Sequence, residues 1–254
     1  MAGRPAAAAI RMAALAASLA ASAACPAQAR DVGARDCAAP VHAQGTNEAL
    51  PKLAAKLKAG GPVAVAVVGT SRALPGGDSR SGRLLDDQFR AAWQRTFPRS
   101  PVELRSRIVP ESEASRIVAE ELPAVAAAGA DLVLWHAGGA DARGNESLKR
   151  FKNALTDGVR LLRKAGSEVL LVAPRQMPRS EGMVNMEPYQ HYIEAVGDRL
   201  DVPVLRRHAI LQHWIDSGMV DLTQAGSQAQ RAELDFVHAC MGMLIVDVLD
   251  RLAR

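Results

Sequence analysis

The stretch Val63-Ala64-Val65-Ala66-Val67-Val68-Gly69-Thr70-Ser71 decides the expected fold. Its apolar part is rich in β-branched valine, and Gly60-Gly61-Pro62 precedes it as a turn signal. A continuous apolar run bounded by turn residues is typical of a strand that is buried on both faces. The run therefore predicts a strand inside a parallel sheet, with Ser71 just beyond its carboxyl end.

Strand and helix patterns alternate on both sides of this run. Further strands are expected over 102–109, 131–135, 169–173 and 202–205, and helices over 47–59, 84–97, 111–128, 188–200 and 239–252, with one more from Leu148 that ends at Gly166. This alternation implies right-handed crossovers between parallel strands, with helices on both faces of the sheet. The expected class is α/β, a three-layer α/β/α sandwich of about five strands.

Residues 1–29 are predicted to be a secretory signal peptide. Arg4 and Arg11 form a basic start, a small apolar stretch runs from Met12 to Ala24, and Ala27-Gln28-Ala29 supplies a small-x-small cleavage pattern. The apolar stretch is too short and too rich in alanine for a stable membrane span. The mature protein is therefore expected to be periplasmic or secreted. Cys25 leaves a lipoprotein as the alternative.

Residues 30–46 are mixed and polar and are expected to form an extended N-terminal tail. Residues 47–254 then form one domain, because no linker rich in Pro, Gly or Ser divides them. The whole chain has a net charge of +4 and a pI of about 9.2. Its Lys and Arg residues are scattered, with no basic run interleaved with aromatics, which argues against a nucleic-acid partner.

Cys37 and Cys240 are the two cysteines left once the leader is removed. In an oxidising compartment they could pair and tie the tail to the C-terminal helix. The alternative is two free thiols, because the sequence does not show whether their Cα atoms come within reach.

Ser71 and the pair Asp235 and His238 are the candidate catalytic residues. Ligands of open parallel sheets sit beyond the carboxyl ends of the strands, where Ser71 lies. Asp235-Phe236-Val237-His238 precedes the expected last helix, so a loop could aim both side chains at one site. His238 would accept the proton of Ser71, and Asp235 would hold and stabilise the imidazole. Taken singly, each residue has a structural explanation: a turn Ser, an N-cap Asp and a helix-start His.

A literal Gly-Asp-Ser occurs at 77–79, but it lies in a loop with no strand before it. Nothing rigid would aim the hydroxyl of Ser79, so Gly77 is interpreted as a turn residue.

Together these blocks resemble the SGNH/GDSL hydrolases. Gly69-Thr70-Ser71 is similar to the first block of that family, and the late Asp-x-x-His is similar to the last. Asp131 to Asp141 resembles the third block, which normally ends in Gly-x-Asn-Asp. The resemblance implies a flavodoxin-like sandwich that hydrolyses esters, often on carbohydrates or lipids, with no metal or organic cofactor.

Two features depart from the family pattern. Ala140 stands where the family has an Asn that donates to the oxyanion, and no Gly follows the second strand. Gly138, Gly139 and Ala140 are the expected oxyanion or substrate-binding residues. Losing one donor typically costs about 2.7–4 kcal/mol, so weak activity is expected.

Several other residues are candidates for the site or its surroundings. His136 could face it or be a core histidine, and Asn145 is expected to cap the next helix. The stretch from Met183 to Tyr189 could pack in the core or line an acyl pocket. The leading hypothesis is an exported serine esterase. The alternative is a catalytically weak or inactive binding module of the cell envelope, and a nucleotide binder lacks the required glycine pattern.

Overall fold

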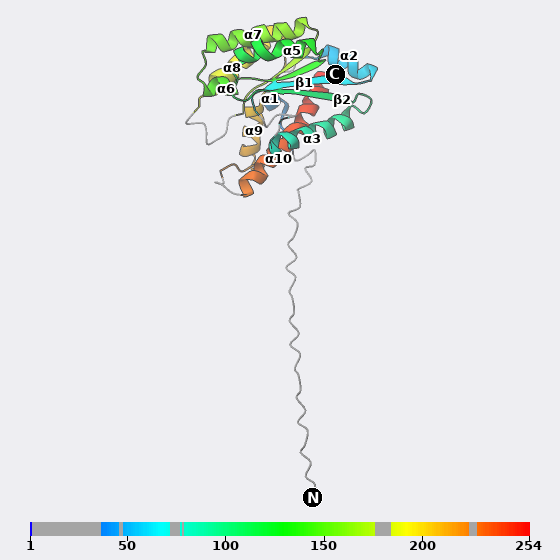
Figure 1. Ribbon diagram of the computed structural model, residues 1–254, viewed down its shortest axis with the longest axis vertical. Coiled ribbons are helices and arrows are strands. Elements are labelled where there is room, and N and C mark those ends of the chain that lie inside the picture. The colour runs from blue at the N-terminus through cyan, green and yellow to red at the C-terminus, as the bar shows by residue number, and fades with distance from the viewer. Residues whose placement is uncertain (2–36, 46–47, 72–76, 78, 176–183, 224–227) are drawn as a thin grey trace. The chain divides into compact units, whose positions relative to one another are not determined.

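Five parallel strands form one sheet in the order β2-β1-β3-β4-β5 in the computed structural model (Figure 1). The strands are β1 (Val63–Gly69), β2 (Val102–Ile108), β3 (Leu132–His136), β4 (Glu168–Val172) and β5 (Val204–Leu205). This is the strand order of flavodoxin-like folds, in which the chain changes direction across the sheet between β1 and β3. The predicted α/β class and strand count are confirmed.

The structure describes Met1 and residues 37–45, 48–71, 77, 79–175, 184–223 and 228–254. Those from Cys37 onward lie in one compact unit, Val32–Arg254. The expected signal peptide, apart from Met1, and Met183 lie outside the described residues.

The helices are α1 (Val41–Gln44), α2 (Pro51–Ala59), α3 (Arg80–Thr96), α4 (Ala114–Arg116), α5 (Leu122–Ala127), α6 (Gly139–Arg143), α7 (Leu148–Lys164), α8 (Glu187–Leu200), α9 (Arg207–Asp216) and α10 (Gln228–Leu252), with a π-helical turn, η2 (Ile117–Glu121), between α4 and α5.

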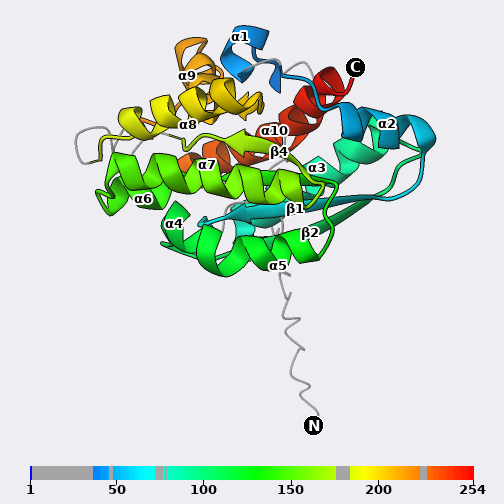
Figure 2. The same cartoon turned by 90° about the horizontal axis from the view of Figure 1, so that it is seen from above.

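The apolar strands divide their side chains between two cores. Val63, Val65 and Val67 pack into one core, whereas Ala66 and Val68 pack into the other. This follows from the period of two along a strand, which sends successive side chains to opposite faces. The first core contains residues of α3, α9 and α10, and the second contains residues of α5, α7 and α8. Figure 1 shows these two sets of helices on opposite sides of the sheet, and Figure 2 shows α7 beside α8.

Glycine lets α10 approach α3 closely. A Cβ added at Gly242 would lie 2.5 Å from the carbonyl oxygen of Leu85 and 3.0 Å from the backbone nitrogen of Phe89. Real Cβ atoms essentially never come so near to backbone atoms. The close contact fixes the position of α10, the helix that carries Asp235 and His238.

Three helical regions differ from the sequence prediction. α9 is not predicted by the sequence, because it begins with the basic residues Arg207 and His208 rather than with an apolar pattern. α10 begins at Gln228 rather than near residue 239, since its first two turns are polar but consist of good helix formers. Asp235 and His238 therefore lie inside a helix and not in a loop. The helix expected over 111–128 is broken by η2, because Pro123 has no N–H to donate within an α-helical turn.

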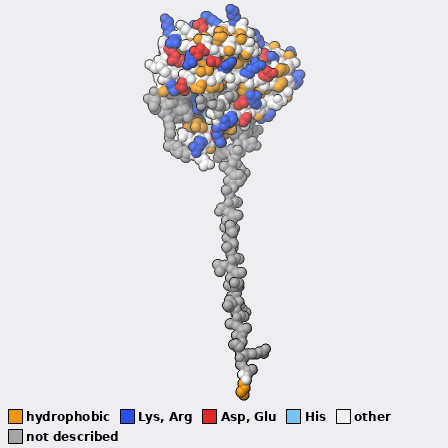
Figure 3. Space-filling model, in the orientation of Figure 1, with side chains coloured by type: hydrophobic (Ala, Val, Ile, Leu, Met, Phe, Trp, Pro, Cys, Tyr) orange, Lys and Arg blue, Asp and Glu red, His pale blue; other side chains and the backbone are white. Residues whose placement is uncertain are grey.

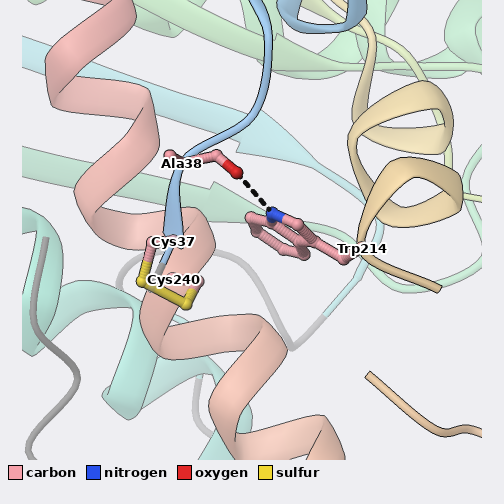
Figure 4. The surroundings of a disulfide bond; sticks show 4 residues. All are labelled: Cys37, Ala38, Trp214 and Cys240. Atoms are coloured by element: carbon pink, nitrogen blue, oxygen red, sulfur yellow. Dashed lines mark hydrogen bonds between the residues drawn. A yellow bond between two sulfur atoms is a disulfide. The ribbon is translucent and has the colours of Figure 1, made fainter. Parts of the chain in front are cut away.

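A disulfide joins Cys37 to Cys240, with their Cα atoms 5.0 Å apart (Figure 4). Nearby, the indole N–H of Trp214 donates to the carbonyl of Ala38 at 3.3 Å. Gly45 forms an isolated bridge with Leu205 of β5. The described part of the segment expected as an extended tail, 37–45, thus packs on the domain and contains α1.

The visible surface carries basic and acidic side chains that are interspersed with apolar ones (Figure 3). β2 lies at the edge of the sheet, and its exposed positions are Glu103, Arg105 and Arg107. Charged side chains on an edge strand oppose pairing with another chain. Within the described part of the chain, no helix is long and apolar enough to span a bilayer.

Candidate active site

Five residues with polar side chains lie at the carboxyl edge of the sheet, and this edge is called the rim. Ser71 follows β1, His136 ends β3, Arg175 follows β4 and Arg207 follows β5. His238 of α10 joins them, because its ring contacts the guanidinium of Arg175. Parallel strands end on the same edge, so this rim is where a ligand of such a sheet is expected.

Ser71 is exposed two residues beyond the end of β1. β1 pairs with β2 on one side and β3 on the other, so the backbone that carries Ser71 issues from the middle of the sheet. Ser79, the Ser of the literal Gly-Asp-Ser, has a different task. Its side chain accepts a hydrogen bond from the N–H of Gly82 at 3.0 Å and so caps the start of α3.

His238 is 1% exposed and makes hydrogen bonds through both ring nitrogens. Nδ1 bonds to the carbonyl oxygen of Leu234, one helical turn earlier. A carbonyl can only accept, so Nδ1 carries the proton of the neutral ring. Nε2 lies 3.3 Å from Nη1 of Arg175, which can only donate. His238 therefore presents an Nε2 lone pair toward the rim, which is the atom a Ser nucleophile requires.

The surroundings of His238 favour its neutral form. Burial, followed by the charge of Arg175, lowers the pKa of His238 to about 4, and the charge of Arg207 acts in the same direction. The Leu234 carbonyl and the charge of Asp235 oppose this shift. His238 is thus an unprotonated base at neutral pH.

Asp235 forms an ion pair with Arg80 at the start of α3. Oδ2 of Asp235 accepts from Nε of Arg80 at 2.9 Å and from Nη2 at 2.8 Å. Asp235 and His238 are three residues apart in α10 and so share a face of the helix. In the structure, however, the imidazole Nδ1–H bonds to the carbonyl of Leu234 and the Asp235 carboxylate bonds to Arg80. A hydrogen bond between Asp235 and His238 is still a prediction.

The expected oxyanion block forms the turn between β3 and α6. Gly138 has a φ of +88°, and its N–H donates to Oδ2 of Asp141 at 3.2 Å. The other oxygen of Asp141 accepts from the N–H of Ala114 at 2.8 Å, which ties this turn to the start of α4. Ala140 is buried in α6. The N–H of Gly138 is therefore used within the turn, and Gly139 and Ala140 are the remaining members of the block.

Arg175 and Arg207 belong to the rim but were missed from the sequence. Each follows a strand at its carboxyl end, which was the signal used for Ser71. Charged residues are normally exposed on the surface, so the sequence gives no sign that Arg207 is buried, with only 6% exposed. His136 is 8% exposed, and its Nδ1 lies 3.4 Å from Nη1 of Arg207. His136 is therefore buried like a core histidine and also lies at the rim, so both alternatives given for it apply.

Other expectations concern the neighbourhood of the rim. Ser147 and not Asn145 is the N-cap of α7, because Asn145 has a φ of +51° and lies in the preceding turn. Tyr189 and Met186 are buried, and the Tyr189 hydroxyl donates to the carbonyl of Glu146 at 2.6 Å. Of the residues 183–189 proposed to line an acyl pocket, these two pack in the core.

A pocket of about 510 Å³ is lined by none of the five rim residues. Its lining residues come from α1, α8, α9 and the end of β5: His42, Ala43, Glu194, Arg206, His208, Ala209, Gln212, His213 and Asp216. The described residues include no group of three or more His, Cys, Asp or Glu side chains that could hold a metal ion.

Comparisons with known proteins place the chain in a family. A profile of the non-GDSL lipase-like family matches residues 36–254. A solved two-domain esterase active on acetylated mannans, crystallised with mannopentaose, is 18% identical, with a TM-score of 0.62 over 84% of this chain and 56% of that one. The chain thus spans just over half the length of that esterase. No curated protein matches the chain.

Two smaller proteins share the fold. A putative lipolytic protein of the G-D-S-L family from Desulfitobacterium hafniense is 14% identical, with a TM-score of 0.52 over 75% of this chain and 99% of that one. A variant of an acetyl xylan esterase from Geobacillus stearothermophilus is 12% identical, with a TM-score of 0.57 over 74% and 94%. The family profile and this fold confirm the resemblance to SGNH/GDSL hydrolases.

Proposed function

The chain belongs to the non-GDSL lipase-like family, and on that premise we propose that it is a serine hydrolase of acyl esters. The observation that carries the proposal is the state of His238. This buried imidazole is neutral, its proton is held on Nδ1, and its Nε2 faces the rim where Ser71 follows β1. That is the tautomer a general base needs to accept a proton from Ser.

In the proposed reaction, Oγ of Ser71 attacks the carbonyl carbon of the ester while its proton passes to Nε2 of His238. The tetrahedral adduct collapses, the bond to the alcohol oxygen breaks, and the imidazolium returns the proton to that oxygen. Water then attacks the acyl-enzyme by the same route and releases the acid. Arg175 must turn away from Nε2 for the first transfer, because its Nη1 lies beside the same lone pair.

Asp235 is kept in the proposal as the carboxylate that stabilises the imidazolium. Its charge favours protonation of His238, even though its oxygens bond to Arg80. The backbone N–H groups of Ser71, Gly139 and Ala140 are the proposed oxyanion donors. Ala140 offers no side-chain amide, so the hole would have fewer donors than a family member with Asn, and a low kcat is expected.

The export of the protein and its substrate class are also part of the proposal. A disulfide suits an oxidising compartment, and the 1–29 leader pattern is the reason to propose secretion or transport to the periplasm. Of the fold neighbours named above, one is an esterase active on acetylated mannans and another is an acetyl xylan esterase. We therefore propose a small acyl ester, on a carbohydrate or a lipid, as the substrate.

The pH profile of ester hydrolysis tests the proposal. For a neutral short-chain aryl ester, kcat/KM is expected to rise with pH through about 4 and to be flat above about pH 5, because the base must be neutral and its pKa is lowered. Circular dichroism at each pH excludes unfolding as the cause of the acid limb. Absence of hydrolysis would contradict the proposal, and an acid limb at the ordinary His value of 6.5 would contradict the lowered pKa of His238.

A second candidate function has its own observation. Arg175 contacts Nε2 of His238, and Ala140 stands in place of the oxyanion Asn. Both features suit a rim that binds a ligand without cleaving it, as a binding module of the cell envelope would. Retention of ligand binding with no hydrolysis of any ester would favour this candidate.

A further inference from the structure

Among the described residues, two guanidinium groups at the rim have no carboxylate partner: that of the buried Arg207 and that of the half-buried Arg175. Within the residues that the structure describes, neither Arg175 nor Arg207 forms an ion pair. Burial lowers the pKa of Arg207 to about 9, and the charge of Arg175 adds to the shift. Arg207 therefore still carries its charge at neutral pH. A buried charge without a counterion is costly, and proteins normally pair it.

The neighbouring arginine shows what a satisfied guanidinium looks like in this protein. Arg206 forms a two-point ion pair with Glu194, with Nε to Oε1 at 3.0 Å and Nη2 to Oε2 at 2.9 Å. Two acidic groups of the site described above have other partners. Asp235 bonds to Arg80, and Asp141 accepts two backbone N–H groups. Among the described residues, no carboxylate pairs with Arg207, whereas Arg206 is paired with Glu194.

Two hydrogen-bond donors in the same cluster find no acceptor among the described residues. The guanidinium Nη1 of Arg207 donates to Nδ1 of His136, so the proton of this neutral imidazole must be on Nε2. Both Nε2 of His136 and Nε of Arg207 are buried and have no hydrogen-bond partner in the part of the chain that the structure describes. Buried donors are nearly always satisfied, so two unpartnered ones beside uncompensated positive charge indicate a missing acceptor.

We propose that His136, Arg175 and Arg207 bind an oxyanion group, and that this group belongs to the ester substrate. The proposal deepens the hydrolase function and rests on it, since it states that the preferred ester carries a carboxylate or a phosphate. Arg presents donors in a planar fork that matches both groups. The anion would accept the unpartnered N–H groups and neutralise charge beside the base.

The position of the cluster links the anion to the ester. The charge of Arg175 acts on Arg207, and Nη1 of Arg175 lies 3.3 Å from Nε2 of His238. An anion that draws the Arg175 guanidinium toward Arg207 would free Nε2 of His238. It would also offset the two positive charges that disfavour the imidazolium, whereas Asp235 and the Leu234 carbonyl already favour it. Binding of an anionic substrate would therefore prepare the base for its proton transfer.

Matched substrates test the proposal with the wild-type protein. One pair, 4-nitrophenyl hemisuccinate and its neutral methyl ester, places the charge on the acyl side. A second pair, 4-acetoxybenzoate and 4-acetoxybenzamide, places it on the alcohol side. At least one anionic member is expected to have a kcat/KM about 10- to 100-fold above its neutral partner, after correction for the hydroxide-catalysed rates.

Variants then assign the preference to the cluster. Arg207→Met is expected to remove the preference for the anionic ester, and Arg207→Lys to retain part of it, while the control Arg206→Met leaves it intact. Circular dichroism of each variant checks folding. A wild-type protein with no preference in either pair would overturn the proposal. An Arg207→Met that lowers both members of a pair equally would also overturn it.

Binding of inorganic phosphate and of acetate, measured by calorimetry, separates this proposal from the hydrolase function and distinguishes the two oxyanions. Whichever of the two anions binds more tightly is expected to have a Kd for the wild type at least about tenfold below its Kd for Arg207→Met. Such binding without any ester hydrolysis would support the anion site and contradict the hydrolase function. Hydrolysis of neutral esters with no binding of either anion would support the hydrolase function and contradict the anion site.

Discussion

Replacement of Ser71 by alanine is expected to lower kcat/KM for a short-chain aryl ester by about 10⁴-fold, because no other group would supply the nucleophile. The fold should be unaffected, since Ser71 is exposed beyond the end of β1. Steady-state kinetics on the purified variant, with its thermal midpoint measured alongside, give the result.

Ser79→Ala is the matched control for this experiment. It removes the Ser of the literal Gly-Asp-Ser and the N-cap of α3, whose Oγ accepts from Gly82. The expected outcome is a stability loss of about 1 kcal/mol with kcat/KM within about twofold of wild type. Full activity in Ser71→Ala together with loss of activity in Ser79→Ala would show that the wrong Ser had been chosen.

Opening the disulfide is expected to reduce the free energy of unfolding by about 4–5 kcal/mol. Cys37 and Cys240 are separated by 203 residues, so the crosslink restricts almost the whole unfolded chain. Urea denaturation of the mature protein with and without a thiol reductant measures the change.

Cysteine variants provide the control for the reductant. Cys37→Ala, Cys240→Ala and the double variant are expected to share nearly the same denaturation midpoint, because the crosslink is lost once in each. Reductant should have no further effect on them. A wild-type midpoint that does not move with reductant would contradict the stabilising role. Because Cys240 lies two residues from His238 on α10, the reduced protein should also lose activity at lower urea.

The central strands could be predicted because their sequences carry a local signal. Val63 to Val68 and Val169 to Ala173 are apolar runs between turn signals, and such runs form strands wherever helices cover both faces of a sheet. Ser71 and the Gly138 region could be recognised because each follows a predicted strand. Asp235 and His238 were recognised instead from their spacing and from their place near the last helix.

Other features depend on tertiary packing and had no local signal. The polar start of α10 contains no apolar periodicity, so the helix around Asp235 could not be recognised. The partner of Asp235 is Arg80, 155 positions earlier, which the close contact of α10 with α3 brings into reach. Arg175 and Arg207 have the composition of surface residues, and only the folded rim reveals that they are partly or fully buried.

Covalent labelling with a fluorophosphonate tests the central claim most directly, because this probe reacts with an activated Ser and not with an ordinary hydroxyl. Peptide mapping by mass spectrometry locates the adduct in the folded wild-type protein, in Ser71→Ala and in Ser79→Ala. The account predicts an adduct on Ser71 in the wild type and in Ser79→Ala, and none in Ser71→Ala or after heat denaturation. A folded wild-type protein with no adduct, or with the same adduct in Ser71→Ala, would contradict it.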